Sequence, residues 1–321
     1  MTIDRPSDEF VKRLIKYYKN HTDDSCLPIW TGAYGPLRKF LLNEDVEEIH
    51  KKFDNIYIDD LWGMDYNQKN SWHLPPYDSC FNRCLSTASN ELKFHHESKE
   101  KSVEKLEEIT GLQFDIPEYP NRPVTKVGNR NIPLRFAVCY YIFHCLNTYL
   151  QIIPSSVLEI GAGTGYFPYL FIKKYPSITY NIIDLPVISV IQTYIYATMV
   201  GEDSIWFHGE PKTNAALRIY SPVDTDDIEG PIDLALNHNS FPEIPRGVQS
   251  KYLKLMEKLF STDAFFYSVN WEPDRSDQTP VHIACKESKF KNVHRRIFPM
   301  ESNVHVSSSI SFFEEIYKIN E

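Results

Sequence analysis

The spacing of apolar residues divides the chain into two parts. From about residue 8 to residue 110, apolar positions recur every three or four residues, as in DEFVKRLIKYYKN and PLRKFLLNEDVEEIHKKF, and this spacing predicts helices. From Pro154 onward, short apolar runs alternate with helix-like segments, beginning with SVLEI, YFPYLFIKKYP, YNIID and VISVIQTYIYATMVG. Strands that alternate with helices pair in parallel, so we expect an α/β fold in which helices cover both faces of a sheet.

Later apolar runs extend this predicted sheet. LRIYSP is the better candidate for the third core strand and SIWFH the weaker one, and IDLALN and DAFFYSVN flank the amphipathic helix GVQSKYLKLMEKLF. VHRRIF and HVSSSISFFEEIYKI would complete the sheet. The prediction is therefore one large α/β sheet preceded by a mainly helical accessory region.

A proline-rich segment, DIPEYPNRPVTKVGNRNIP, joins the two parts. Its prolines prevent a long helix or a central strand, which favours a linker. A second interpretation has Gly128 and Asn129 lining a ligand pocket. We divide the chain here into residues 1–125, a helical accessory region or substrate lid, and residues 126–321, the sheet-forming domain.

The charge of the chain argues against nucleic acid as a partner. It has 34 basic and 43 acidic residues, a formal net charge of −9, and no basic run. MTIDRPSDEF does not resemble a secretory signal, so we expect a cytoplasmic protein. Polar residues interrupt the longest apolar stretch, from Phe136 to Ile153, which predicts a buried helix and no membrane span.

The six cysteines are expected to be reduced thiols in that compartment. CFNRC, which contains Cys80 and Cys84, is followed by His95 and His96. These residues could form a zinc site, although the spacing is not a standard one. The alternative is that the two cysteines pack on one face of a helix.

A cluster of glycines follows the first predicted strand. Gly161, Gly163 and Gly165 lie within five positions, although the whole chain has only 12 glycines. A glycine turn between a strand and a helix lets backbone N–H groups approach a ligand closely. The dinucleotide fingerprint G-x-G-x-x-G/A needs a third small residue, but Tyr166 occupies that position. An NAD-dependent oxidoreductase or epimerase is therefore the disfavoured alternative.

The observed spacing, Glu-x-Gly-x-Gly-x-Gly from Glu159 to Gly165, resembles the first motif of Rossmann-like methyltransferases that use S-adenosylmethionine. Asp184 ends the next predicted strand, 19 residues after Gly165. An acidic side chain about 20 residues beyond such a turn can bind a ribose diol. The other interpretation is that Asp184 caps the helix that follows it.

A narrower resemblance covers about residues 125 to 275. DLALNHNSFPEI, YLKLMEKL, FYSVNWE and IIDLPVISVIQTYI are similar to segments of the sugar O-methyltransferase family found in gene clusters for glycans and glycosylated metabolites. The resemblance implies a class I methyltransferase fold, S-adenosylmethionine as cofactor and a carbohydrate acceptor. Asn237, Ser240 and Glu243 match the family pattern Asn-x-x-Ser-x-x-Glu, and Asn270 matches its last motif. His238 and Ile244 depart from the pattern.

These motifs define the predicted site. The residues expected to bind the cofactor are Glu159, Gly161, Gly163, Gly165, Asp184, Pro222 and Asn237. The residues expected to bind the substrate are Asn239, Ser240, Asn270 and Trp271.

Removal of the acceptor's proton needs a general base, and His238 and Glu243 are the two candidates. Their alternatives are an exposed loop histidine and half of a capping box with Ser240. Tyr267 could stack on a sugar, and Trp30, Trp62 and Trp72 could do so on the acceptor side. The alternative for these three tryptophans is packing between small helices. No cluster of acidic residues resembles a dedicated metal site, so dependence on a divalent metal is open but not favoured. A homo-oligomer, and a methyltransferase-like module that binds without turnover, also stay open.

Overall fold

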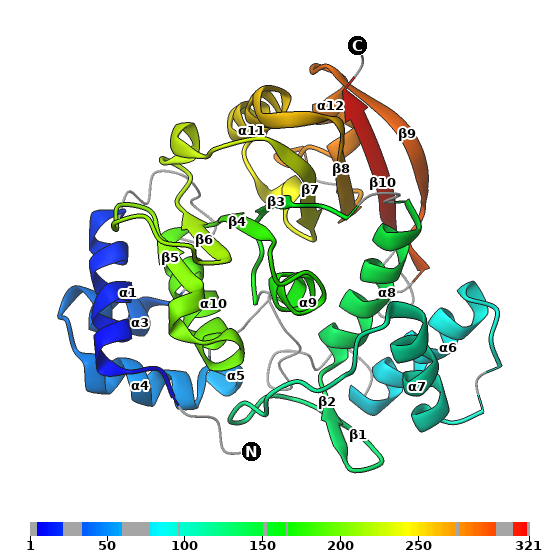
Figure 1. Cartoon of the computed structure of the whole chain (residues 1–321), viewed down its shortest axis with the longest axis horizontal. Helices are drawn as coiled ribbons and strands as arrows, with labels where there is room; N and C mark the ends of the chain where they lie inside the picture. The colour runs from blue at the N-terminus through cyan, green and yellow to red at the C-terminus, as the bar shows by residue number, and fades with distance from the viewer. Residues whose placement is uncertain are drawn as a thin grey trace.

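The structure is a computed structural model (Figure 1). It describes residues 5–21, 34–59, 77–95, 97–149, 153–164, 166–273, 276–299 and 311–319. Trp30, Trp62, Trp72, His96 and Gly165 therefore lie outside the described residues.

Eight strands of the described residues form one sheet, in the order β5-β6-β4-β3-β7-β8-β10-β9. Six neighbouring strands, β5 to β8, pair in parallel, whereas β10 is antiparallel to both β8 and β9. The predicted α/β sheet is confirmed, including LRIYSP as the core strand β6. The strands are β3 Ser156–Ile160, β4 Thr179–Ile183, β5 Ile205–Phe207, β6 Leu217–Tyr220, β7 Ile232–His238, β8 Phe260–Trp271, β9 Phe290–Ile297 and β10 Phe312–Ile319.

Helices cover both faces of this sheet, as expected because successive residues of the core strands, which point to opposite faces, are both buried. On one face, Val157 and Tyr180 pack with apolar side chains of three helices, α8 Leu134–Tyr149, α9 Tyr166–Lys174 and α10 Pro186–Val200. On the other face, Leu158 and Ile183 pack with α11 Arg246–Leu259 and α12 Val281–Cys285. The apolar stretch that begins at Phe136 thus forms the buried helix α8, as predicted.

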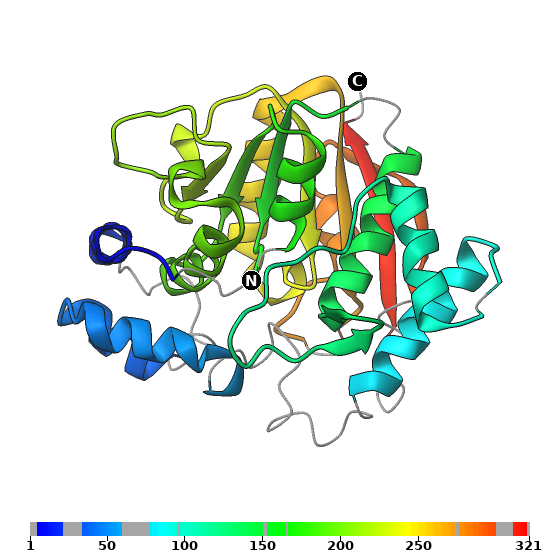
Figure 2. The ribbon, with the colours of Figure 1, turned by 60° about the horizontal axis from the view of Figure 1, so that its bottom comes forward.

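The N-terminal helices lie in two groups rather than in one body (Figure 1). The first group contacts α10 through α1 and α4 and comprises α1 Asp8–Asn20, α3 Gly35–Leu42, α4 Val46–Asp54 and α5 Ile56–Asp59. The second group packs beside α8 and comprises α6 Tyr77–Glu91 and α7 Lys99–Thr110. Figure 2 shows the first group at one end of the sheet and β9 and β10 at the other.

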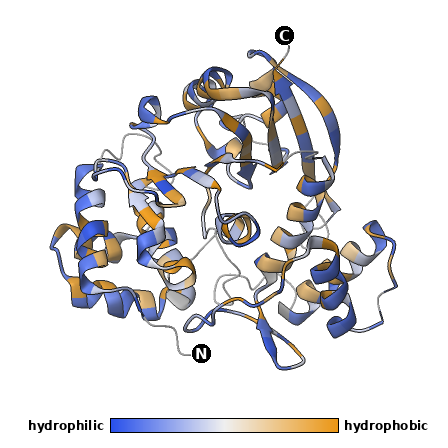
Figure 3. Ribbon diagram, viewed as in Figure 1, coloured by the Kyte–Doolittle hydropathy of each residue, from blue (hydrophilic) through white to orange (hydrophobic). Residues whose placement is uncertain are grey.

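Apolar side chains of both groups belong to the same hydrophobic cluster as one face of the sheet. Phe53 of α4, for example, stacks on Tyr194 of α10 with ring centroids 3.7 Å apart. Helices at the rim, such as α1 and α4, carry both hydrophilic and hydrophobic residues (Figure 3). The functional division at residue 125 remains a prediction, but the packing across it is continuous.

The paired cysteines and Gly128 each had two possible roles in the sequence. Cys80 and Cys84 are buried within α6, while His95 is exposed, and the two thiols pack into the core. Gly128 forms the turn of a small hairpin, β1 Thr125–Val127 and β2 Arg130–Ile132, and its N–H donates to Glu100 of α7. No helix among the described residues is long and apolar enough to cross a membrane.

Leu14 provides a test of whether α1 belongs to the cooperative core. Its side chain is fully buried in the helix that packs on α10. Leu14→Ala should lower the free energy of unfolding by about 2–5 kcal/mol, because it removes buried methyl groups and leaves a cavity. Urea unfolding followed by circular dichroism measures the change. Lys16→Ala, at an exposed position of the same helix, is the control. Equal midpoints for the two variants would mean that α1 is not part of the core.

Candidate functional site

The loops that carry the predicted site residues meet at one edge of the sheet. Strands β3, β4, β6, β7 and β8 are parallel, so their carboxyl ends face the same way. Ligands of open α/β sheets bind beyond these ends. The residues that end these strands are Ile160, Ile183, Tyr220, His238 and Trp271.

Gly161 begins the turn after β3 and fits tightly against the next loop. Its φ is +70°, and its N–H donates to the carbonyl of Ile183 at 2.8 Å. A Cβ at this position would lie 2.2 Å from Oγ of Ser240. Glycine is therefore required here by backbone conformation and by the close approach of Ser240.

Gly163 has the opposite surroundings. Its φ is +60°, yet a Cβ placed on it would meet no atom within 4 Å. Its N–H donates to Oδ2 of Asp184 at 3.1 Å. The turn is thus held from the β4 side and is open above Gly163, as a site for close ligand approach requires.

Asp184 is held against this turn and does not cap α10. Its Oδ1 accepts the N–H of Leu185 at 2.8 Å, and the residue is 9% exposed. The N-cap of α10 is Leu185, which makes no side-chain capping bond. Burial raises the pKa of Asp184 to about 7, while N–H bonds from Gly163, Leu185 and Ala162 act in the opposite direction.

Glu159 lies beneath the turn in the sheet. It is 1% exposed, and the hydroxyl of Tyr180 donates to its Oε2 at 2.7 Å. Burial raises the pKa of Glu159 to about 8, and the nearby charge of Asp184 adds to this effect. Its expected contact with a cofactor remains a prediction.

Asn237 connects the glycine turn to the loop after β7. Its Nδ2 donates to the carbonyl of Ile160 at 2.6 Å and to Oγ of Ser240 at 2.7 Å. Its Oδ1 accepts the N–H of Phe241 at 3.0 Å. Asn237 is buried, so these bonds satisfy a side chain that water does not reach.

Asn270 extends the same network to β8. Its Nδ2 donates to Oδ1 of Asn237 at 2.8 Å, and its Oδ1 accepts the N–H of Ser240 at 3.0 Å. Both ends of this amide are engaged inside the protein. Asn270 and Ser240 therefore support the loop, and their expected contacts with substrate remain predictions.

The two candidate bases lie on either side of this network. His238 ends β7 and is partly buried, with its ring edge-on to Phe167 at 5.7 Å. Glu243 is a partly buried residue of the 3₁₀ helix Phe241–Glu243. Asn239 has a φ of +61° and donates its N–H to the carbonyl of Val269, which places it on the same loop.

The predicted aromatic contacts separate into two cases. Trp271, at the end of β8, is partly buried, with its ring centroid 6.3 Å from that of Phe312. Tyr267 is 1% exposed and donates its hydroxyl to Glu314, so the prediction that it could stack on a sugar is wrong. The sequence pattern could not show this, because successive residues of β8 are buried on both faces of the sheet and no polar alternation marks either face.

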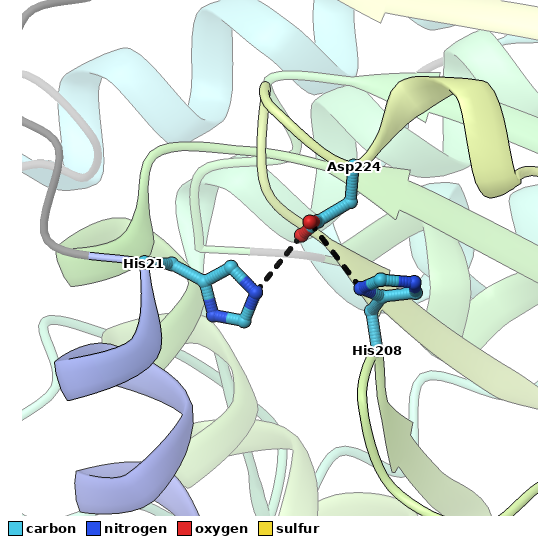
Figure 4. Close-up of side chains that lie close together, drawn as sticks. All are labelled: His21, His208 and Asp224. Atoms are coloured by element: carbon cyan, nitrogen blue, oxygen red, sulfur yellow. Dashed lines mark ion pairs between the residues drawn. The ribbon is translucent and has the colours of Figure 1, made fainter.

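The loop after β6 contains Pro222, which is partly buried, and Val223, which is 58% exposed. Ser221 begins this loop and donates both its N–H and its hydroxyl to Asp224. Figure 4 shows that Asp224 also faces His21 and His208. No sequence motif marks these histidines, because the three residues lie far apart in the chain.

Tyr166 explains why the turn departs from the dinucleotide fingerprint. It is the first residue of α9, is 3% exposed, and contacts Phe136 edge-to-face at 5.4 Å. A large ring thus fills the position where that fingerprint needs a small residue for close packing of helix and strand.

No family model and no curated protein matches this chain. Solved structures similar to it include the StiE O-MT, residues 961–1257, with a TM-score of 0.42 and 11% identity over 58% of this chain and 76% of the other. Another is the glycopeptide N-methyltransferase MtfA complexed with sinefungin, at 0.39 and 9% over 55% and 84%. A third is an O-methyltransferase of a Brevibacillus brevis trans-AT PKS multienzyme in complex with S-adenosyl-L-homocysteine, at 0.39 and 9% over 52% and 67%. Similarity this low does not identify the function of this chain.

The contact between Gly161 and Ser240 can be tested by stability. Gly161→Ala should lower the free energy of unfolding by about 1–3 kcal/mol, because it adds strain at positive φ and overpacking against Ser240. Gly163 also has a positive φ, but a side chain there would meet open space. Gly163→Ala should therefore lower the free energy of unfolding by less than Gly161→Ala. Urea unfolding compares the two variants.

A double-mutant cycle isolates the contact itself. In a Ser240→Gly background, Gly161→Ala should lower the free energy of unfolding by no more than Gly163→Ala does, because the side-chain atoms of Ser240 are absent. An unchanged cost in that background would contradict the role given to Ser240.

Proposed function

We propose that this chain is an S-adenosylmethionine-dependent O-methyltransferase that methylates a hydroxyl of a sugar, within a nucleotide sugar or a glycan. The observation that carries the proposal is the turn after β3. It is open above Gly163 and is held by Asp184 from the end of the neighbouring strand β4.

The topology supports a methyl donor over NAD. The classic dinucleotide-binding sheet has strand order 3-2-1-4-5-6. Here the antiparallel strand β10 lies between β8 and β9, and Tyr166 fills the position of the third small residue. The sugar acceptor rests on the resemblance of the segments around Asn237, Ser240 and Glu243.

The residues present fit the donor at this edge. The uncluttered side of Gly163 suits close approach of a ligand to the backbone, and the Asp184 carboxyl suits a ribose diol. Pro222 would supply an apolar surface for an adenine ring. Asn237 would act indirectly, because it fixes the end of β3 and the loop after β7.

S-adenosylmethionine supplies a methyl group bonded to a positively charged sulfur. In the transfer, an O–CH3 bond forms as the S–CH3 bond breaks, and the acceptor hydroxyl gives up its proton. The protein must hold the acceptor oxygen in line with that bond and accept the proton. We assign the proton to His238 or Glu243, with Asn239 and Trp271 holding the sugar.

Isothermal calorimetry with S-adenosylhomocysteine and, in parallel, NAD tests the cofactor. We expect micromolar binding of S-adenosylhomocysteine and none of NAD. Gly163→Val should abolish binding because its side chain fills the open side of the turn. NAD binding alone would support an oxidoreductase, and binding of neither ligand would overturn the assignment.

The same titration has a predicted pH dependence. The pKa of Asp184 is raised to about 7, so its carboxyl is largely neutral below that pH and charged above it. A charged carboxylate accepts ribose hydrogen bonds more strongly, so affinity should rise between pH 6 and pH 8. Asp184→Asn should bind weakly and lose this rise.

The choice of base is tested with a panel of nucleotide sugars and glycans, with release of S-adenosylhomocysteine as the readout. For the residue that acts as base, His238→Ala or Glu243→Gln should lower kcat by about 10²–10⁴ and spare cofactor binding. His282→Ala, a partly exposed histidine on α12, is the control. Full activity in both test variants would show that neither residue is the base. Cofactor binding without turnover on any acceptor would favour a silent binding module.

A further inference from the structure

A cluster of two histidines and one aspartate joins α1 to the edge of the sheet (Figure 4). His21 directly follows α1, His208 directly follows β5, and Asp224 lies in the loop after β6. One ligand atom from each of the three residues lies within 4.8 Å of the others. Among the described residues, this is the only group of its kind.

The distances within the cluster suit a shared ion. Nε2 of His21 lies 3.1 Å from Oδ2 of Asp224, and Nδ1 of His208 lies 3.3 Å from Oδ1 of the same carboxylate. Two ligands bound at about 2.05 Å to a tetrahedral ion are separated by about 3.3 Å. Each histidine nitrogen thus lies near this spacing from an oxygen of Asp224, and all three ligand atoms lie within 4.8 Å of one another, so a small adjustment would bring them around one ion with a fourth position left for water.

The remaining ring nitrogen of each histidine has an acceptor beside it. Nδ1 of His21 lies 2.7 Å from the carbonyl of Tyr17, and a carbonyl can only accept, so this nitrogen carries a hydrogen. Nε2 of His208 lies 3.1 Å from Oδ2 of Asp227. In the neutral rings, the nitrogens that face Asp224 are then the ones with free lone pairs. Histidines that bind metals show this arrangement.

We propose that His21, His208 and Asp224 bind a divalent transition-metal ion, with Zn²⁺ as the ion of choice. Imidazole and carboxylate are ligands of zinc, and three protein ligands with one open position form a known type of zinc site. Asp227 orients His208 and adds negative charge beside the ion.

The carboxylate of Asp224 is held in place by Ser221, which begins the same loop. The N–H and hydroxyl of Ser221 donate to Oδ2 at 3.1 and 2.7 Å, which fixes the carboxylate. Side chains of His21 and Asp224 are 9% and 12% exposed, so bulk water competes little for the site.

The alternative is that protonated histidines pair with Asp224 and that no ion binds. The two cases differ in what they require. Ion pairs need protons and are lost as pH rises, whereas a metal needs neutral histidines and binds better as pH rises from 6 to 8. Direct titration with zinc therefore separates them.

The test uses the full chain, treated with EDTA and dialysed, with no methyl donor present. Calorimetry with ZnCl2 at pH 7.5 should show one ion per chain at micromolar affinity or tighter, and zinc should raise the Tm. His21→Ala, His208→Ala and Asp224→Asn should each abolish both effects. Asp227→Asn should weaken binding about 10–100-fold, because it removes only an orienting partner.

His95→Ala is the matched control, since it removes an exposed histidine of the other candidate zinc site, the one that the sequence suggested with Cys80 and Cys84. It should leave zinc binding unchanged, and Co²⁺ bound in place of zinc should show no thiolate charge-transfer band. Circular dichroism confirms that each variant is folded. Absence of binding, binding retained in His21→Ala and His208→Ala, or loss of binding in His95→Ala would each overturn the proposal. Because no methyl donor is present, these outcomes are independent of the proposed methyl transfer.

Discussion

The side chain of Asn237 holds together the edge of the sheet on which the candidate site depends. Its amide joins the end of β3, the loop after β7 and, through Asn270, the end of β8. Asn237 and Asn270 are buried, so a lost bond at either amide would leave a polar atom without water. The glycine turn therefore stands on a rigid hydrogen-bonded base.

This hydrogen-bonded base limits which residues fit in the turn after β3. Ser240 approaches Gly161 so closely that no side chain fits between them, and the same serine accepts a hydrogen bond from Asn237. Gly163, two residues further on, has open space on its side-chain face. One turn thus contains a glycine required by the protein's own packing and another whose open face is suited to a ligand.

Much of this architecture is encoded locally and could be predicted. The strands β3, β4, β6, β7 and β8 are short apolar runs flanked by turns, and parallel pairing follows from the helices between them. Because parallel strands end at one edge, the convergence of Gly161, Asp184 and the loop after β7 was predictable too. The Asn and Ser of the Asn-x-x-Ser spacing are joined by hydrogen bonds that support the loop, and their expected contacts with cofactor or substrate remain predictions.

Other features depend on contacts between distant segments, which a single sequence does not show. The sequence could not predict to which face of the sheet Tyr267 points, because β8 is buried on both faces. The depth of Glu159 and Asp184, and hence their raised pKa values, depends on what packs around the turn. The cluster at His21 needs α1 to reach the far edge of the sheet, which no local pattern encodes.

Asp224 links that cluster to the candidate cofactor edge. It fixes Ser221, the first residue of the loop that carries Pro222, and Tyr220 before it accepts the N–H of Asp184 at 3.3 Å. The stretch 220–224 thus touches the predicted ribose residue at one end and the histidines at the other. Any coupling between ligands at the two proposed sites would pass through this stretch, and its free energy would be the same whichever ligand binds first. The N-terminal helix α1 thereby contributes to the edge of the site through His21.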